Sequence, residues 1–191
     1  SNFAMGRRKG INNRTVFMLD FGLARMFVNA KGEIRSPRVS PGFRGTIRYA
    51  SPNTHHDKDL GRVDDLWSLL YMMIEFTTGS LPWSQMADKD EVGKLKETIL
   101  DPVLLKDCPP GYQDILTHLK KLKYPDRPDY PRLYQAFTVM MNDLAISEID
   151  PYDWELEERR PSARTTERKL LEDRIKQFQG QPAAFQCNEI L

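Results

Sequence analysis

The residues best suited to chemistry form the tripeptide Asp20-Phe21-Gly22, which follows an apolar run at residues 15–19 that is typical of a strand. A carboxylate at a strand end, with a glycine two positions later, can approach a bound ion or phosphate closely. Asn2 lies 18 positions before Asp20, and a hairpin would bring both residues to one edge. Carboxylate and amide oxygens suit a hard cation, so this edge is a candidate Mg²⁺ site.

A largely helical frame has to position these residues. The segment 63–78 is apolar on every side, which indicates a helix buried in the middle of the body. Asp64 and Asp65 suit the positive end of that helix, and Gly79 suits the position just beyond its last residue.

Three further helices are predicted from apolar residues that recur three and four positions apart. They cover residues 112–122, residues 130–144 with Asp129 as the N-cap, and a shorter stretch at 92–99 after Asp88. Residues 3–5 can pair with the strand at 15–19, whereas residues 29–52 have no consistent period and are expected to be a long, functional or disordered loop. The expected fold is therefore mainly α, a helical bundle around one buried helix with a small β-hairpin.

Composition divides the chain and excludes some classes of protein. We expect residues 1–145 to form the body and residues 146–191 to form a charged extension. From Glu155 to Lys176, 13 of the 22 residues are charged, which predicts a solvated helix or a disordered tail. The net charge of +1 argues against a nucleic-acid binder. The sequence contains no run of 18 apolar residues, the length needed to span a membrane. The two cysteines form no disulfide framework, which indicates a reducing compartment, so we expect the protein in the cytoplasm or the nucleus. We also expect a monomer.

The three histidines and three tryptophans suggest no binding site. His55, His56 and His118 lack a third ligand at metal spacing, so solvated surface is the expected environment. The tryptophans are expected to be packing residues; they are Trp67, Trp83 and Trp154.

The order of these segments resembles the large, C-terminal lobe of a eukaryotic protein kinase, beginning inside the catalytic loop. Residues 45–53 resemble the Gly-Thr-x-Arg-Tyr-Ala-Ser-x-Asn motif of the casein kinase I superfamily, apart from Pro52, and residues 79–83 carry that family's Pro-Trp motif. Residues 18–25, 42–46 and 150–154 resemble the tau-tubulin kinase branch. The resemblance implies a serine/threonine protein kinase that uses ATP and Mg²⁺ and acts on protein substrates.

The resemblance also implies roles on the nucleotide side. Asn2 matches the catalytic-loop ligand of the second Mg²⁺, and Asp20 matches the aspartate that bridges Mg²⁺ to the ATP phosphates. Phe21 matches the residue whose packing separates active from inactive arrangements, and Gly22 completes the cofactor-binding tripeptide.

Other roles concern the protein substrate. Thr46 matches a substrate-facing threonine that contacts the catalytic machinery, and Asp65 matches the aspartate that supports the catalytic loop. Arg48 matches an anion site for a phosphorylated or acidic substrate, because a guanidinium binds phosphate through two hydrogen bonds. Arg44 adds positive charge nearby, although ordinary solvated loop charges explain these arginines equally well. Cytoskeletal substrates follow from the resemblance alone.

Several parts of a kinase have no match in the 191 residues. They are the Gly-rich loop, the strand lysine, its glutamate partner and the catalytic aspartate, which belongs five residues before Asn2. We therefore expect this chain to be inactive alone. Three interpretations stay open: a kinase whose front half is not in this sequence, a catalytically dead interaction module, and a non-functional truncated product.

Overall fold

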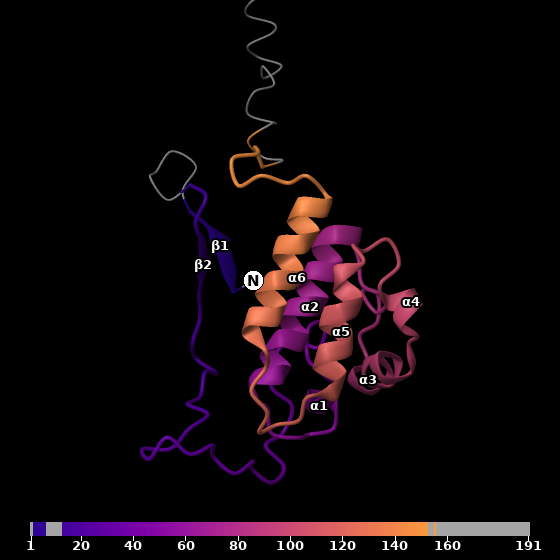
Figure 1. Cartoon of the computed structure of the whole chain (residues 1–191). Coiled ribbons are helices and arrows are strands. Elements are labelled where there is room, and N and C mark those ends of the chain that lie inside the picture. Colours follow the sequence, from indigo (N-terminus) through magenta and orange to yellow (C-terminus); the bar gives the residue numbers. More distant parts are fainter. Residues whose placement is uncertain (1, 7–12, 153–154, 156–191) are drawn as a thin grey trace, which may run out of the picture. The chain divides into compact units, whose positions relative to one another are not determined.

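The computed structural model describes residues 2–6, 13–152 and 155 of the chain (Figure 1). The chain divides into two compact units, Ser1–Leu144 and Ala145–Leu191. Trp154 and the charged segment 156–176 lie outside the described residues. Within the described part of the chain, no helix is both long and apolar enough to cross a membrane.

The first unit is mainly helical with one small hairpin among its described residues, and the predicted fold class is confirmed. Its elements, in chain order, are β1 (Phe3–Met5), β2 (Val16–Met18), α1 (Pro52–His55), α2 (Arg62–Thr78), α3 (Lys89–Thr98), α4 (Asp101–Leu104), α5 (Gly111–Lys121) and α6 (Tyr130–Asp143). The four longer helices lie where apolar spacing predicts them. The helices α1 and α4 were not predicted, because four residues are too few to show a period.

The hairpin has the predicted pairing. β1 and β2 are antiparallel, with Phe3 opposite Met18 and Met5 opposite Val16. Beyond the last pair, the Leu19 N–H donates to the Asn2 carbonyl at 2.7 Å. Asn2 is therefore bonded to the residue just before Asp20, at one end of the hairpin.

The helix α2 runs through the core, as predicted. The Gly61 N–H donates to the Asp64 carboxylate at 2.7 Å at its start, and Gly79 ends it in the left-handed conformation, with φ of 85°. Its buried residues are Val63, Asp64, Trp67, Leu70, Tyr71 and Ile74. The prediction that the helix is buried on every side is wrong at its last turn, where Phe76 is 73% exposed.

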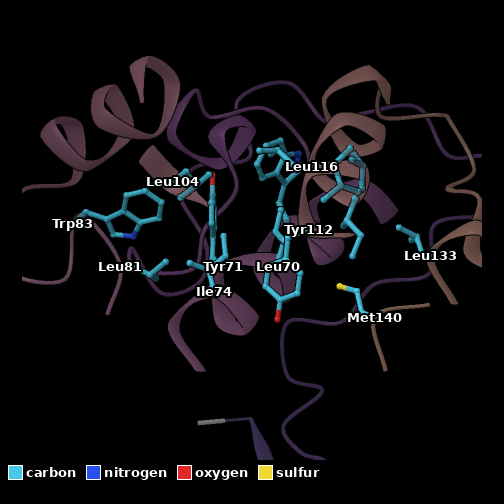
Figure 2. Packing of buried hydrophobic residues seen from close by; sticks show 14 of the residues in the cluster. Leu70, Tyr71, Ile74, Leu81, Trp83, Leu104, Tyr112, Leu116, Leu133 and Met140 are labelled. Carbon is cyan, nitrogen blue, oxygen red and sulfur yellow. The ribbon is translucent and has the colours of Figure 1, made fainter. Parts of the chain in front are cut away.

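The core gathers around Tyr71 of α2. Figure 2 shows Trp83 on one side of this ring and Leu133 and Met140 farther away on the other. The rings of Tyr71 and Trp83 meet edge to face, with centroids 4.9 Å apart. The predicted packing role of Trp67 and Trp83 is confirmed, because both are buried.

Two of the remaining helices, α3 and α6, begin at aspartate caps. Asp88 accepts hydrogen bonds from the Asp90 and Glu91 N–H groups at 2.9 Å, and Asp129 accepts one from the Arg132 N–H at 3.0 Å. The N-cap predicted at Asp129 is confirmed. These caps fix where α3 and α6 begin, and α3 in turn packs against α1 below the loop that carries Thr46 and Arg48.

Candidate functional site

Asp20 occupies a strained turn directly after the hairpin. Its φ is 59°, in the left-handed region that aspartate tolerates better than most residues. The Asp20 Oδ1 accepts a hydrogen bond from the Gly22 N–H at 3.0 Å. A Cβ on Gly22 would lie 3.1 Å from that oxygen, so the glycine leaves room for the carboxylate to sit over the turn.

The two polar residues at this end of the hairpin carry the kind of oxygen atom that Mg²⁺ prefers. The side chains of Asn2 and Asp20 are both exposed, and both offer hard oxygen ligands. Among the described residues, no group of three histidine, cysteine, aspartate or glutamate side chains gathers around a metal position. A Mg²⁺ ion held here would therefore take its other ligands from water and from phosphate, which is its usual preference.

Phe21 lies open to solvent in this structure. Its side chain is 65% exposed, and its carbonyl accepts from the Ala24 N–H at 2.9 Å to close the turn. The neighbouring Leu23 is 68% exposed. An apolar pair this open is typical of a surface that another part of a protein covers.

Asp59 fastens the loop that follows Asp20. Arg25 donates to its carboxylate at 2.9 Å, and Arg38 donates through its backbone N–H at 2.8 Å and its guanidinium at 2.7 and 3.1 Å. Burial raises the pKa of an aspartate, but the hydrogen bonds from Arg38 and Arg25 outweigh burial and hold the pKa of Asp59 well below its usual range. Sequence reasoning missed this residue, because its two arginine partners lie 34 and 21 positions away in the chain.

Two further contacts attach the same loop. The guanidinium of Arg62 lies over the Phe27 ring, 4.5 Å from its centroid, and the Tyr124 hydroxyl donates to the Arg35 carbonyl at 3.1 Å. The contact of Phe27 attaches the chain to α2 just before residues 29–52, the segment predicted to be a long functional or disordered loop. That segment is itself attached at Arg35, through Tyr124, and at Arg38, through Asp59.

A tight turn at residues 46–50, called the 46–50 turn below, presents Thr46 and Arg48. The N–H groups of Tyr49 and Ala50 both donate to the Thr46 carbonyl at 3.0 Å. Thr46 and Arg48 are exposed on this turn, while Ala50 is buried. The backbone therefore directs two of the predicted site residues outward from one rigid segment.

The charge of Arg48 is already paired. Its guanidinium donates to the Glu75 carboxylate at 2.9 Å and to the Ser84 carbonyl at 3.4 Å. The Tyr49 hydroxyl bonds to the same carboxylate, and this hydrogen bond, with burial, raises the pKa of Tyr49. Arg44 is exposed, with its Nε 3.4 Å from the Pro41 carbonyl. Any anion bound by Arg48 has to share it with Glu75.

Asp64 and Asp65 are neighbours with different surroundings. Asp64 is buried and accepts from the Ser51 hydroxyl at 2.6 Å and the Asn53 amide at 3.0 Å. Asp65 makes none of these contacts; partial burial and the adjacent Asp64 charge raise the pKa of its carboxyl. The sequence singled out Asp65 by its motif, whereas the dense polar network lies on Asp64.

His55 differs from the prediction of a solvated surface, whereas His56 is exposed as predicted. The His55 ring packs edge-on against Phe43 at 5.4 Å, and burial, with the Lys96 charge, lowers its pKa. His56 forms an ion pair with Glu97. The prediction is wrong for His55 because α3 covers it, which the sequence spacing of the two histidines does not indicate.

Comparisons with known proteins identify similar chains. The family of protein tyrosine and serine/threonine kinases matches residues 11–137. A probable serine/threonine-protein kinase of Dictyostelium discoideum is 50% identical over 157 residues, which cover 82% of this chain and 32% of that protein. An inactive tau-tubulin kinase of Caenorhabditis elegans is 36% identical over 82% of this chain and 57% of its own length.

Another Caenorhabditis elegans relative, a serine/threonine-protein kinase, is 34% identical over 83% of this chain and 43% of its own length. The chain thus spans between 32% and 57% of the length of these relatives.

Proposed function

The chain belongs to the protein tyrosine and serine/threonine kinase family, and from that premise we propose that the protein containing it transfers a phosphoryl group from ATP to serine or threonine side chains of protein substrates. The observation that carries the proposal is the backbone hydrogen bond from Leu19 to Asn2 at the end of the hairpin. This hydrogen bond brings Asn2 to the same edge as Asp20, whose carboxylate accepts from the Gly22 N–H.

On the nucleotide side, Asn2 and Asp20 would hold Mg²⁺. The ion, when bound, would neutralise charge on the ATP phosphates. The hydrogen bond from the Gly22 N–H holds the Asp20 carboxylate in place. Five residues after Asp20, the bond from Arg25 to Asp59 attaches the chain to the helical part of the unit.

On the substrate side, Thr46 and Arg48 would face the protein substrate from the 46–50 turn. We assign the protein to the casein kinase I superfamily and its tau-tubulin branch, supported by the motif at residues 45–53 and by the similarity to an inactive tau-tubulin kinase. A preference for acidic segments would depend on Arg44 and on Arg48, whose charge Glu75 already shares.

A second candidate is a non-catalytic module that binds proteins. One similar protein is named an inactive kinase, and the 46–50 turn is built from contacts within this chain. The 191 residues also contain no match to the catalytic aspartate or the ATP-binding lysine. We therefore propose that phosphoryl transfer belongs to a longer protein and that this chain alone binds without catalysing.

The test is phosphorylation of casein by the longest available protein that contains this chain, with ATP and Mg²⁺. Asp20→Asn removes the charge that would hold the ion, and we expect kcat to fall by about a hundredfold or more. The matched control is Asp57→Asn, another exposed aspartate with a positive φ, 52°, outside the site. Equal activity of Asp20→Asn and the unaltered protein would refute the metal role, and no transfer by the unaltered protein would favour the binding module.

A further inference from the structure

Lys96 of α3 is a buried cation that the proposed reaction does not use. It is only 6% exposed, and its amino group donates to the Ile47 carbonyl at 2.6 Å and to the Ala50 carbonyl at 2.7 Å. These partners lie 49 and 46 positions earlier in the chain. The amino group of Lys96 therefore supports the 46–50 turn from its buried side.

A second side chain supports the same turn. The Trp83 Nε1–H donates to the Arg48 carbonyl at 2.8 Å. Three carbonyls among four consecutive residues thus accept hydrogen bonds from side chains of distant segments. Because it is unfavourable to leave a carbonyl away from water without its donor, these bonds favour one backbone shape.

The surroundings of the Lys96 amino group are mainly aromatic. It lies 5.1 Å from the centroid of the Tyr71 ring and 5.0 Å from that of the Trp83 ring. Nε2 of His55, on α1, is 3.3 Å away. Rings attract the cation through their faces, but they replace water less fully than a carboxylate would.

The other charged and titratable groups nearby are engaged elsewhere. Arg48 and Tyr49 of the turn both bond to Glu75 of α2, and His56, just after α1, pairs with Glu97 of α3. Among the described residues, no carboxylate forms a recorded ion pair with Lys96. Its hydrogen bonds to the turn are therefore its main polar contacts.

Burial lowers the pKa of Lys96 to about 7. A protonated amine has three N–H groups and can donate to both carbonyls and to His55; a neutral amine has two and can accept from the imidazole instead. Both states leave two donors for Ile47 and Ala50. The support of the turn is thus compatible with either protonation state.

Gly93 sets how closely α3 approaches α1. A Cβ on Gly93 would lie 2.9 Å from the Cβ, Cγ and Nδ1 atoms of His55, so no larger residue fits without displacing the imidazole. Lys96 follows one turn later on the same helix. The close approach at Gly93 keeps the amino group of Lys96 beneath the turn.

We propose that Lys96 is a positioning residue for substrate binding: its buried amino group fixes the backbone of the 46–50 turn so that Thr46 and Arg48 face the bound protein substrate. The identity of what binds there rests on the proposed function, whereas the support of the turn by Lys96 does not. The residue acts through the turn and touches no reacting atom.

The first test is residue-resolved amide hydrogen exchange on the full chain. Lys96→Met keeps an apolar stem and removes the donors, so we expect the Tyr49 and Ala50 amides to exchange at least about tenfold faster, with α5 amides unchanged. The control is Lys94→Met, on the same helix but exposed. Exchange of the turn amides in Lys96→Met at the rate of the control would overturn the proposal.

The second test uses substrate kinetics of the longer protein. Lys96→Met is expected to lower kcat/KM for casein at least about tenfold and to leave the KM for ATP within about twofold. An equal rise in the KM for ATP would indicate general damage and contradict a positioning role. Absence of kinase activity in the unaltered protein would refute the proposed function, while the exchange result would still decide the role of Lys96.

A third measurement decides the question if Lys96→Met does not fold. In the unaltered chain, NMR detects nuclear Overhauser effects between the side-chain CH₂ protons of Lys96 next to its amino group and the protons of Ile47 and Ala50. We expect contacts to both residues, because the amino group donates to both carbonyls. Absence of these contacts in the folded chain would overturn the proposal.

Discussion

The hairpin end around Asp20 and the 46–50 turn are held in contrasting ways. The hairpin relies on main-chain hydrogen bonds, and its apolar side chains are open: Phe17 is 41% exposed and Met18 is 58% exposed. The turn relies on side chains of distant segments, above all Lys96 and Trp83, and it is backed by the buried core.

This difference separates what the chain supports by itself from what needs a further surface. An exposed apolar stretch such as β2 and the residues after it is typical of a surface that other protein covers. The turn needs no such cover, because Lys96 and Trp83 of the same unit donate to three of its carbonyls. We infer that the 46–50 turn keeps its shape in this chain, whereas the shape of the hairpin end depends on what packs against the hairpin.

The largest effect is expected from Asp64→Ala, which removes the buried carboxylate that bonds to Ser51, the residue directly after the turn. The change takes the acceptor from the Ser51 hydroxyl and the Gly61 N–H, both bonded to Asp64 within 2.7 Å. We expect the free energy of unfolding to fall by about 3 kcal/mol, measured by urea denaturation. Asp65→Ala, one residue later, is the control and should cost less than about 1 kcal/mol. Equal losses in the two variants would contradict the assigned network.

Asp59→Asn should have the next largest effect, because the buried carboxylate neutralises Arg25 and Arg38. An amide leaves one side of Arg38 facing an N–H group, and we expect a loss of about 2 kcal/mol with faster proteolysis in the 25–38 loop. Asp57→Asn, exposed and nearby, should cost less than about 0.5 kcal/mol. Proteolysis of this loop at the unaltered rate would argue against the clamp.

The pH dependence of this clamp has a definite sign. The pKa of Asp59 is lower in the folded protein than its ordinary value of 3.8, so the unfolded chain binds the proton more tightly. Its contribution to stability is present above pH 3.8 and is lost as the pH falls further. The free energy of unfolding should therefore drop more steeply in the unaltered chain than in Asp59→Asn over this acidic range.

Gly93→Ala should have the smallest effect on stability, about 1 kcal/mol, because the clash with His55 exceeds the gain in helix propensity. The effect should be local: the Ala50 amide exchanges faster, and the hairpin amides stay unchanged. Lys94→Ala, on the exposed side of α3, is the matched control. Increased stability of Gly93→Ala would show that α1 and α3 have room to separate.

Local patterns account for much of the fold. The apolar run at residues 15–19 predicts β2, the apolar residues at 63–78 predict α2, and Asp129 marks the start of α6, because each signal lies within a few neighbouring residues. The motif around Asp20 and the motif at 45–53 likewise identify the candidate site without any long-range information.

Long-range polar contacts could not be predicted. Asp59 meets Arg25 and Arg38 across 34 and 21 positions, and Lys96 meets Ile47 across 49. No period links such residues, and a lysine on an amphipathic helix is normally solvated. The exposure of Phe76 was missed for a related reason, since only the packing of neighbouring helices decides which end of α2 is covered.

The contrast between the two regions is tested most directly by hydrogen exchange of two amides in the unaltered chain. The Leu19 amide bonds to the Asn2 carbonyl at 2.7 Å, and the Ala50 amide bonds to the Thr46 carbonyl at 3.0 Å, so each has a main-chain partner. We predict that the Ala50 amide exchanges about a hundredfold more slowly than the Leu19 amide, relative to their unstructured rates. Equal protection, or stronger protection of Leu19, would contradict the account.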